Sequence, residues 1–245
     1  QNTCDSGSVT YGGMRVWENE KAVSQICFSR ELSPTMLFGQ NTLRVKEYFK
    51  MASCYYPAWD AEYAERLTKE FGLDLKKKVC KMNKGMMSMV TITLALASRA
   101  PITILDEPVA GLDVYMRDRF YDLLLADYEE TGRTFIISTH IIEEAANLLE
   151  ETIILNDGTI TLKENTQELI DSCRYVSGLA ETVDRAANGY ERLHTEVLGR
   201  SKTVCIRTKP GQQLDLSAYG NELTVSPVPL QKIFVYLTKR QGEAV

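Results

Sequence analysis

The sequence predicts an α/β fold in which a parallel β-sheet is flanked by helices. Residues 102–105 are apolar or β-branched and run directly into two carboxylates and a proline, which is typical of a buried parallel strand. Residues 134–137 repeat the apolar pattern and end in Ser-Thr-His. Between these stretches, residues 117–130 carry apolar side chains at helical spacing, so a crossover helix is expected there.

Upstream of these strands, the sequence indicates a short hairpin, a strand and a helical region. Paired glycines follow residues 9–11, which predicts a tight turn, and residues 23–28 are expected to form a buried strand. Apolar residues recur every four positions between Asp60 and Gly72, which predicts a helix. Asp60 is expected to cap its start and Gly72 to end it. Residues 84–99 form the next predicted helix, with Asn83 as its cap.

Downstream, residues 152–162 predict a hairpin around an Asp-Gly turn. The remaining pattern is mixed and suggests a small α+β region. Strands are expected at residues 175–179, 203–208 and 223–228, and helices at 168–173, 179–189 and 230–237.

Composition narrows the class of protein. The chain has 245 residues with 44% hydrophobic and 25% charged side chains, which suits one large globular domain or a domain with an appendage. A net charge of −5 argues against a nucleic-acid partner. No apolar run approaches the ~20 residues that span a bilayer. The six cysteines are scattered and the two histidines lie far apart, so reduced thiols are expected and a zinc site is not.

Asp106 and Glu107 are the first candidate site residues. Ligands of open α/β sheets bind at the carboxyl ends of the strands, and two adjacent carboxylates there suit a hydrated metal and an attacking water. An acidic turn after an ordinary strand is the alternative. Asn83 marks a second candidate site, because a capped helix start presents backbone N–H groups to an anion.

Four stretches in order give a more specific signal than any one of them. They are residues 82–88, residues 102–107, Gly111-Leu112-Asp113 and the strand that ends in His140. In this order and at about this spacing they resemble the signature loop, Walker B segment, D-loop and switch histidine of ABC transporter ATP-binding subunits. The signature loop looks like the Ser-Lys-Gly-Met variant of some bacterial transporter ATPases. The resemblance covers roughly residues 5–162 and, more loosely, the tail.

The resemblance implies a RecA-like P-loop NTPase core. Residues 1–162 would be the ATPase domain, with a helical signature subdomain at about residues 42–98. Residues 163–245 would be a small C-terminal α+β appendage with a structural, dimerising or regulatory role.

The resemblance also assigns roles and ligands, namely ATP and Mg²⁺. Asp106 would hold Mg²⁺ through water, and Glu107 would polarise the attacking water. His140 would donate to the γ-phosphate, and Asp113 would contact the partner subunit. Glu31 stands where the family places its Q-loop glutamine. It could hold a metal-bound water, or it could be an ordinary exposed loop carboxylate.

The signature residues Asn83, Lys84, Gly85 and Met86 would approach ATP held by the opposite subunit. Gly85 would let the backbone come close to the γ-phosphate. Asn83 departs from the family, in which serine is usual at this position, but asparagine can also cap and donate.

One expected motif does not occur. The family's Walker A loop, GxxxxGK[ST], requires a glycine followed by lysine, and no glycine here is followed by lysine. We therefore expect a chain that lacks about forty residues at its N-terminus, from the usual domain layout. Without the loop's N–H groups and lysine, these 245 residues alone should hydrolyse ATP poorly.

The function that the resemblance implies is that of the ATPase motor subunit of a bacterial ABC transporter. It would be cytoplasmic, bound to the inner face of the membrane through a transmembrane permease subunit, and paired with a second, identical or different ATPase subunit. The alternative is a degenerate, non-catalytic interaction subunit. A DNA-repair ABC ATPase fits less well, since the sequence holds no sustained heptad for a coiled-coil insert.

Overall fold

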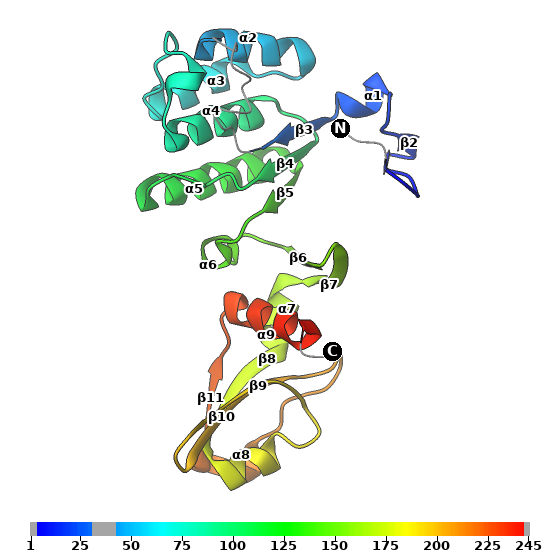
Figure 1. The fold of residues 1–245 in the computed structure, drawn as a ribbon, viewed down its shortest axis with the longest axis vertical. Helices are drawn as coiled ribbons and strands as arrows, with labels where there is room; N and C mark the ends of the chain where they lie inside the picture. Colours follow the sequence, from blue (N-terminus) through cyan, green and yellow to red (C-terminus); the bar gives the residue numbers. More distant parts are fainter. Residues whose placement is uncertain (1–3, 31–42, 243–245) are drawn as a thin grey trace. The chain divides into compact units, whose positions relative to one another are not determined.

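The computed structural model describes residues 4–30 and 43–242 (Figure 1). The chain divides into two compact units, Gln1–His140 and Ile141–Val245, which are described separately below. None of the described helices is long and apolar enough to cross a membrane.

The first unit is built on a parallel three-stranded sheet. Its strands are β3 (Ile26–Ser29), β4 (Ile102–Asp106) and β5 (Thr134–Ser138), in the order β3-β4-β5. Helix α5 (Val114–Thr131) connects β4 to β5 and ends at Gly132, whose φ of 63° is the left-handed conformation that glycine adopts readily. The parallel pair with its crossover helix is therefore confirmed.

Strand β5 is less buried than the sequence predicts. Its side chains alternate between exposed and half-buried, and Ile136 is 48% exposed. The physical reason is the face on which these side chains lie. Ile136 is in register with Ile104 and Phe28, and Phe28 is 55% exposed, so one face of the described sheet is little covered. An apolar composition alone does not show whether both faces of a strand are covered.

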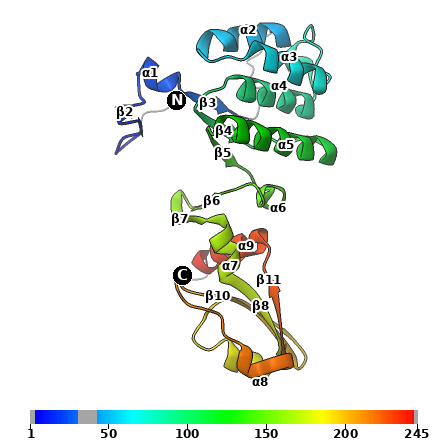
Figure 2. The same cartoon turned by 180° about the vertical axis from the view of Figure 1, so that it is seen from behind.

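Between β3 and β4 the described residues form three helices, α2 (Val45–Tyr55), α3 (Ala61–Glu70) and α4 (Lys84–Ala97). A 3₁₀ turn at Val79–Lys81 precedes α4. Asp60 caps α3 as predicted, accepting the Tyr63 N–H at 2.8 Å. In both views α2 and α3 lie on the opposite side of α4 from α5 (Figures 1 and 2). Because α4 has neighbours on both sides, most of its residues are buried.

The N-terminal part begins with the predicted hairpin. β1 (Thr10–Tyr11) and β2 (Met14–Arg15) pair across Gly12 and Gly13, both with positive φ. The strand expected from residue 23 begins later, at Ile26. The cause is a short helix, α1 (Glu20–Val23), whose start is capped by Asn19.

The second unit begins with α6 (Ile142–Ala145) and a hairpin of β6 (Glu151–Asn156) and β7 (Thr159–Asn165). Asp157 and Gly158 both have positive φ at the turn, which confirms the Asp-Gly hairpin. The boundary expected at residue 162 falls inside β7, and the structure groups the whole hairpin with the second unit.

A four-stranded antiparallel sheet forms the body of this unit. Its strands are β8 (Cys173–Leu179), β9 (Glu191–Leu198), β10 (Ser201–Arg207) and β11 (Leu223–Pro227), in the order β11-β8-β10-β9. The helices are α7 (Thr166–Ser172), α8 (Ala180–Ala186) and α9 (Leu230–Gly242), and a 3₁₀ segment covers Ser217–Glu222. The tail is thus a mixed helix and strand unit, as its pattern predicts.

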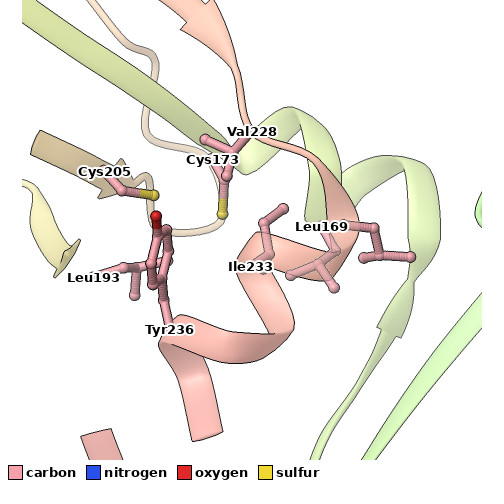
Figure 3. Packing of buried hydrophobic residues seen from close by; sticks show 8 residues of the cluster. Leu169, Cys173, Leu193, Cys205, Val228, Ile233 and Tyr236 are labelled. Atoms are coloured by element: carbon pink, nitrogen blue, oxygen red, sulfur yellow. The ribbon is translucent and has the colours of Figure 1, made fainter. Parts of the chain in front are cut away.

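Each face of this sheet has its own apolar core. Val176, Val204 and Ile206 pack with Val183 of α8 on one face. On the other face, α7 and α9 close a cluster in which Figure 3 shows Ile233 between Leu169 and Cys173. Cys205 lies in the same cluster, where burial raises the pKa of its thiol to about 12. All six cysteines are free.

Candidate functional site

Two carboxylates stand at the carboxyl end of β4. Asp106 is the last residue of the strand, and its Oδ1 accepts a hydrogen bond from Ser138 Oγ at the end of β5. Glu107 follows with a φ of 47°, a strained value for a residue other than glycine. Its N–H donates to the Ser138 carbonyl at 2.9 Å, which fixes the backbone at this point.

His140 lies directly against Glu107. Its Nδ1 is 2.8 Å from Glu107 Oε1, and its backbone N–H donates to the same oxygen at 3.1 Å. The other oxygen, Glu107 Oε2, is buried and has no hydrogen-bond partner within the described part of the chain. The histidine side chain itself is 76% exposed. One oxygen of the glutamate is thus held in place, while the second is a buried acceptor without a partner among the described residues.

The start of α4 forms the second part of the site. Asn83 caps this helix, its Oδ1 accepting the Met86 N–H at 2.8 Å. Gly85, in the first turn, touches the loop that follows Glu107: a Cβ at this position would lie 2.6 Å from the Gly111 carbonyl oxygen. Gly111 in turn lies under the side chain of Lys84, where a Cβ would come within 2.7 Å of Cγ.

A hydroxyl reinforces this contact. Ser88 Oγ, one turn further along α4, donates to the Ala110 carbonyl at 2.7 Å. Asp113 ends the same loop and caps α5 by accepting the Met116 N–H at 2.9 Å. The loop 107–113 is therefore anchored both to the start of α4 and to the start of α5.

The structure brings the expected site residues into two neighbouring groups. Asp106, Glu107 and His140 meet at the ends of β4 and β5. Lys84 and Gly85 contact the loop that ends in Asp113, and the capping bond between Asn83 and Met86 lies at the start of the same helix. Glu31 lies outside the described residues.

Sequence reasoning missed Ser138 and Ser88. The signal for Ser138 was present in principle, because parallel pairing of the two strand ends sets Asp106 opposite Ser138. The Ser88 contact has no comparable local signal, since it depends on how α4 packs on the loop.

The acids fit Mg²⁺ held jointly with phosphate. Among the described residues no group of three or more histidine, cysteine, aspartate or glutamate side chains could form a metal site by itself. Mg²⁺ keeps several waters and is usually held by one or two carboxylates together with substrate phosphates. Asp106, with one oxygen occupied by Ser138, matches that requirement.

The first unit has the fold of an ATP-binding cassette, a RecA-like arrangement of parallel strands and helices. An ATP-binding subunit of an ABC transporter superposes with a TM-score of 0.59 at 23% identity, over 68% of this chain and 70% of that chain. The cassette MJ0796, in a dimeric post-hydrolysis state bound to ADP and phosphate, gives 0.54 at 22% identity, over 66% and 74%. At such identities the likeness shows the fold.

Sequence relatives point the same way. YtrB, an ABC transporter ATP-binding protein of Bacillus subtilis (strain 168), is 23% identical over 67% of this chain and 55% of its own length. The taurine import ATP-binding protein TauB of Shigella flexneri is 34% identical over 48% and 46%. A family model described as "AAA domain, putative AbiEii toxin, Type IV TA system" matches residues 38–146. The chain spans about half the length of these relatives. The resemblance to ABC transporter ATP-binding subunits is confirmed.

Proposed function

We propose that this chain forms part of the ATP-hydrolysing subunit of a bacterial ABC transporter, which couples ATP hydrolysis to transport through a separate permease. The observation that carries the proposal is the Glu107–His140 pair beside Asp106, at the carboxyl ends of two adjacent parallel strands. Catalysis of phosphoryl transfer requires mainly that the reacting groups are positioned and that developing charge is stabilised. These three residues can supply both.

Each residue has a separate task in the proposed reaction. The Glu107 carboxylate accepts a hydrogen bond from the attacking water, and His140 fixes its orientation through Oε1. The exposed ring of His140 is accessible to the γ-phosphate. Asp106 would hold Mg²⁺, which would neutralise charge on the phosphates.

The second group of residues serves a second subunit. Asn83, Lys84, Gly85 and Met86 stand at the start of a helix of 14 residues, where the backbone dipole favours an anion. We assign them to the nucleotide of the opposing ATPase subunit, and Asp113 to the contact between subunits. The structural neighbour MJ0796, a bacterial ABC transporter cassette, is a dimer, which supports this arrangement.

The remaining assignments follow from the same proposal. Glu31 is assigned to the metal-bound water. The protein works at the cytoplasmic face of the membrane with a transmembrane permease as partner. Residues 163–245 form an accessory region with a structural, dimerising or regulatory role.

The test is Mg²⁺-dependent ATP turnover of the full-length natural protein. Glu107→Gln keeps the size of the side chain but removes the base, so turnover should fall by about 10²–10⁴-fold while ATP binding persists. Glu129→Gln, an exposed glutamate on α5, is the matched control and should leave turnover unchanged. Absence of nucleotide binding by the wild type would contradict the proposal and favour a non-catalytic interaction subunit.

A further inference from the structure

Ser138 touches both acids of the site. In the register of the parallel sheet it lies opposite Asp106, and its hydroxyl donates to Asp106 Oδ1. Its carbonyl oxygen accepts the Glu107 N–H at 2.9 Å. One residue at the end of β5 therefore contacts the two acids through two different groups, its side chain and its backbone.

We propose that Ser138 is a positioning residue that holds one oxygen of the Asp106 carboxylate so that the other faces the hydrated metal. The inference rests on the proposed function and extends it to a residue that does not itself contact the nucleotide or the metal. The terminal torsion of an aspartate has a broad minimum, so a carboxylate without a partner rotates freely. Hydrogen bonds to ligating carboxylates orient them, and their loss typically weakens metal binding by about 10–100-fold.

The solvent exposure of the hydrogen bond between Ser138 and Asp106 sets how much metal affinity should be lost when the hydroxyl is removed. Ser138 is exposed, so water can partly replace its hydroxyl, and the loss should lie near the lower end of that range. The main-chain bond from Glu107 does not depend on the side chain and should survive the substitution. Removing the hydroxyl should therefore affect metal binding and leave the backbone at Glu107 in place.

A competing role predicts the opposite sign. The Ser138 hydroxyl could instead compete with a metal-bound water for the same Asp106 oxygen. Removing the hydroxyl would then free that oxygen and strengthen metal binding. The direction of the change therefore decides between the two roles.

The experiment measures binding of a non-hydrolysable fluorescent ATP analogue to the full-length protein across a Mg²⁺ titration. Ser138→Ala should raise the half-saturating Mg²⁺ concentration by about tenfold. Affinity for the analogue at saturating Mg²⁺ and the melting temperature should not change. Ser138→Thr retains the hydroxyl and should stay within about twofold of the wild type. The control Ser53→Ala removes a hydroxyl that bonds within α2, to Lys50 at 2.8 Å, and should have no effect.

The outcomes separate this inference from the proposed function. A wild type that binds the analogue only with Mg²⁺, together with an unchanged or lowered Mg²⁺ requirement in Ser138→Ala, overturns the positioning role and leaves the ATPase proposal standing. A requirement raised equally in Ser138→Ala and Ser138→Thr also overturns it, because the hydroxyl would then not be the cause. A wild type that binds no analogue at any Mg²⁺ concentration overturns both.

Discussion

His140 and Glu107 meet at a single carboxylate oxygen. Both the ring Nδ1 and the backbone N–H of the histidine lie within hydrogen-bond distance of Oε1, at 2.8 and 3.1 Å. Two contacts to one oxygen fix the rotation of the carboxylate.

The first prediction concerns this pair. His140→Ala removes the ring, the proposed donor to the γ-phosphate, but keeps the backbone bond, so Glu107 should remain near its position. We expect ATP turnover to fall by about 10²-fold or more with little change in ATP binding. Single-turnover kinetics of the full-length protein measure this. The other histidine, His194, stacks on Tyr236 in the second unit, and His194→Ala should leave turnover unaffected.

The second prediction concerns the contact between Gly85 and Gly111. Replacing glycine by alanine inside a helix normally stabilises it by about 0.5–1 kcal/mol. Here the new Cβ would lie 2.6 Å from a backbone oxygen, so Gly85→Ala should instead destabilise the first unit by about 1–3 kcal/mol. Urea denaturation measures the change, and a gain in stability would show that the loop can move away without cost.

The third prediction concerns a buried ion pair. Arg133 Nε lies 2.7 Å from Asp127 Oδ1, and both side chains are almost fully buried. Arg99 adds a second guanidinium at 3.1 Å. Asp127→Asn would leave the buried Arg133 without its charge partner, while Arg99 keeps its pair with Asp60, so unfolding free energy should fall by about 3–5 kcal/mol. Glu65→Gln, which breaks the exposed pair with Lys69, is the control and should change little.

The fourth prediction is a pH dependence. Burial acts to raise the pKa of Asp60, but hydrogen bonds from the Tyr63 N–H and Arg99 outweigh it and lower the pKa below the ordinary value of 3.8. A lowered folded-state pKa means that the charged carboxylate stabilises the fold fully above that ordinary value. This stabilisation is lost as the pH falls through the folded-state pKa.

Asp60→Asn tests the prediction. The wild type should be more stable than the variant at pH 6, by about 1 kcal/mol or less since asparagine also caps helices. The difference should shrink below about pH 4. Denaturation midpoints at several pH values measure it, and a difference that stays constant down to about pH 2.5 would contradict the assignment.

The fifth prediction concerns the core of the second unit. Ile233 is fully buried between α9 and the sheet, so Ile233→Ala should cost about 2–5 kcal/mol. Val225 on the edge strand β11 is 44% exposed, and Val225→Ala should cost much less. Calorimetry of the full-length protein can compare the two variants. Similar losses would mean that α9 is not tightly packed.

The sequence predicted what depends on local pattern. Periodicity predicts the two strands that precede Glu107 and His140 and the helix between these strands. Capping preferences predict the cap at Asn83. The closeness of Glu107 and His140 follows in turn, because carboxyl ends of neighbouring parallel strands share one edge.

What the sequence could not predict depends on distant partners. The exposure of Ile136 is set by what covers its face of the sheet, and the Gly85–Gly111 contact by the packing of α4 on a loop. The order β11-β8-β10-β9 joins segments far apart in the chain, and many pairings would satisfy the same alternation of side chains.

The left-handed backbone of Glu107 has a consequence for protein engineering. At a φ of 47° glycine or asparagine would fit with less strain, so substitution by either should make the folded chain more stable. A selection that rewards heat resistance alone should therefore remove glutamate at this position, and a selection that rewards ATP turnover should restore it. Comparing the residues recovered at position 107 under the two selections would reveal a conflict between thermal stability and ATP turnover at this residue.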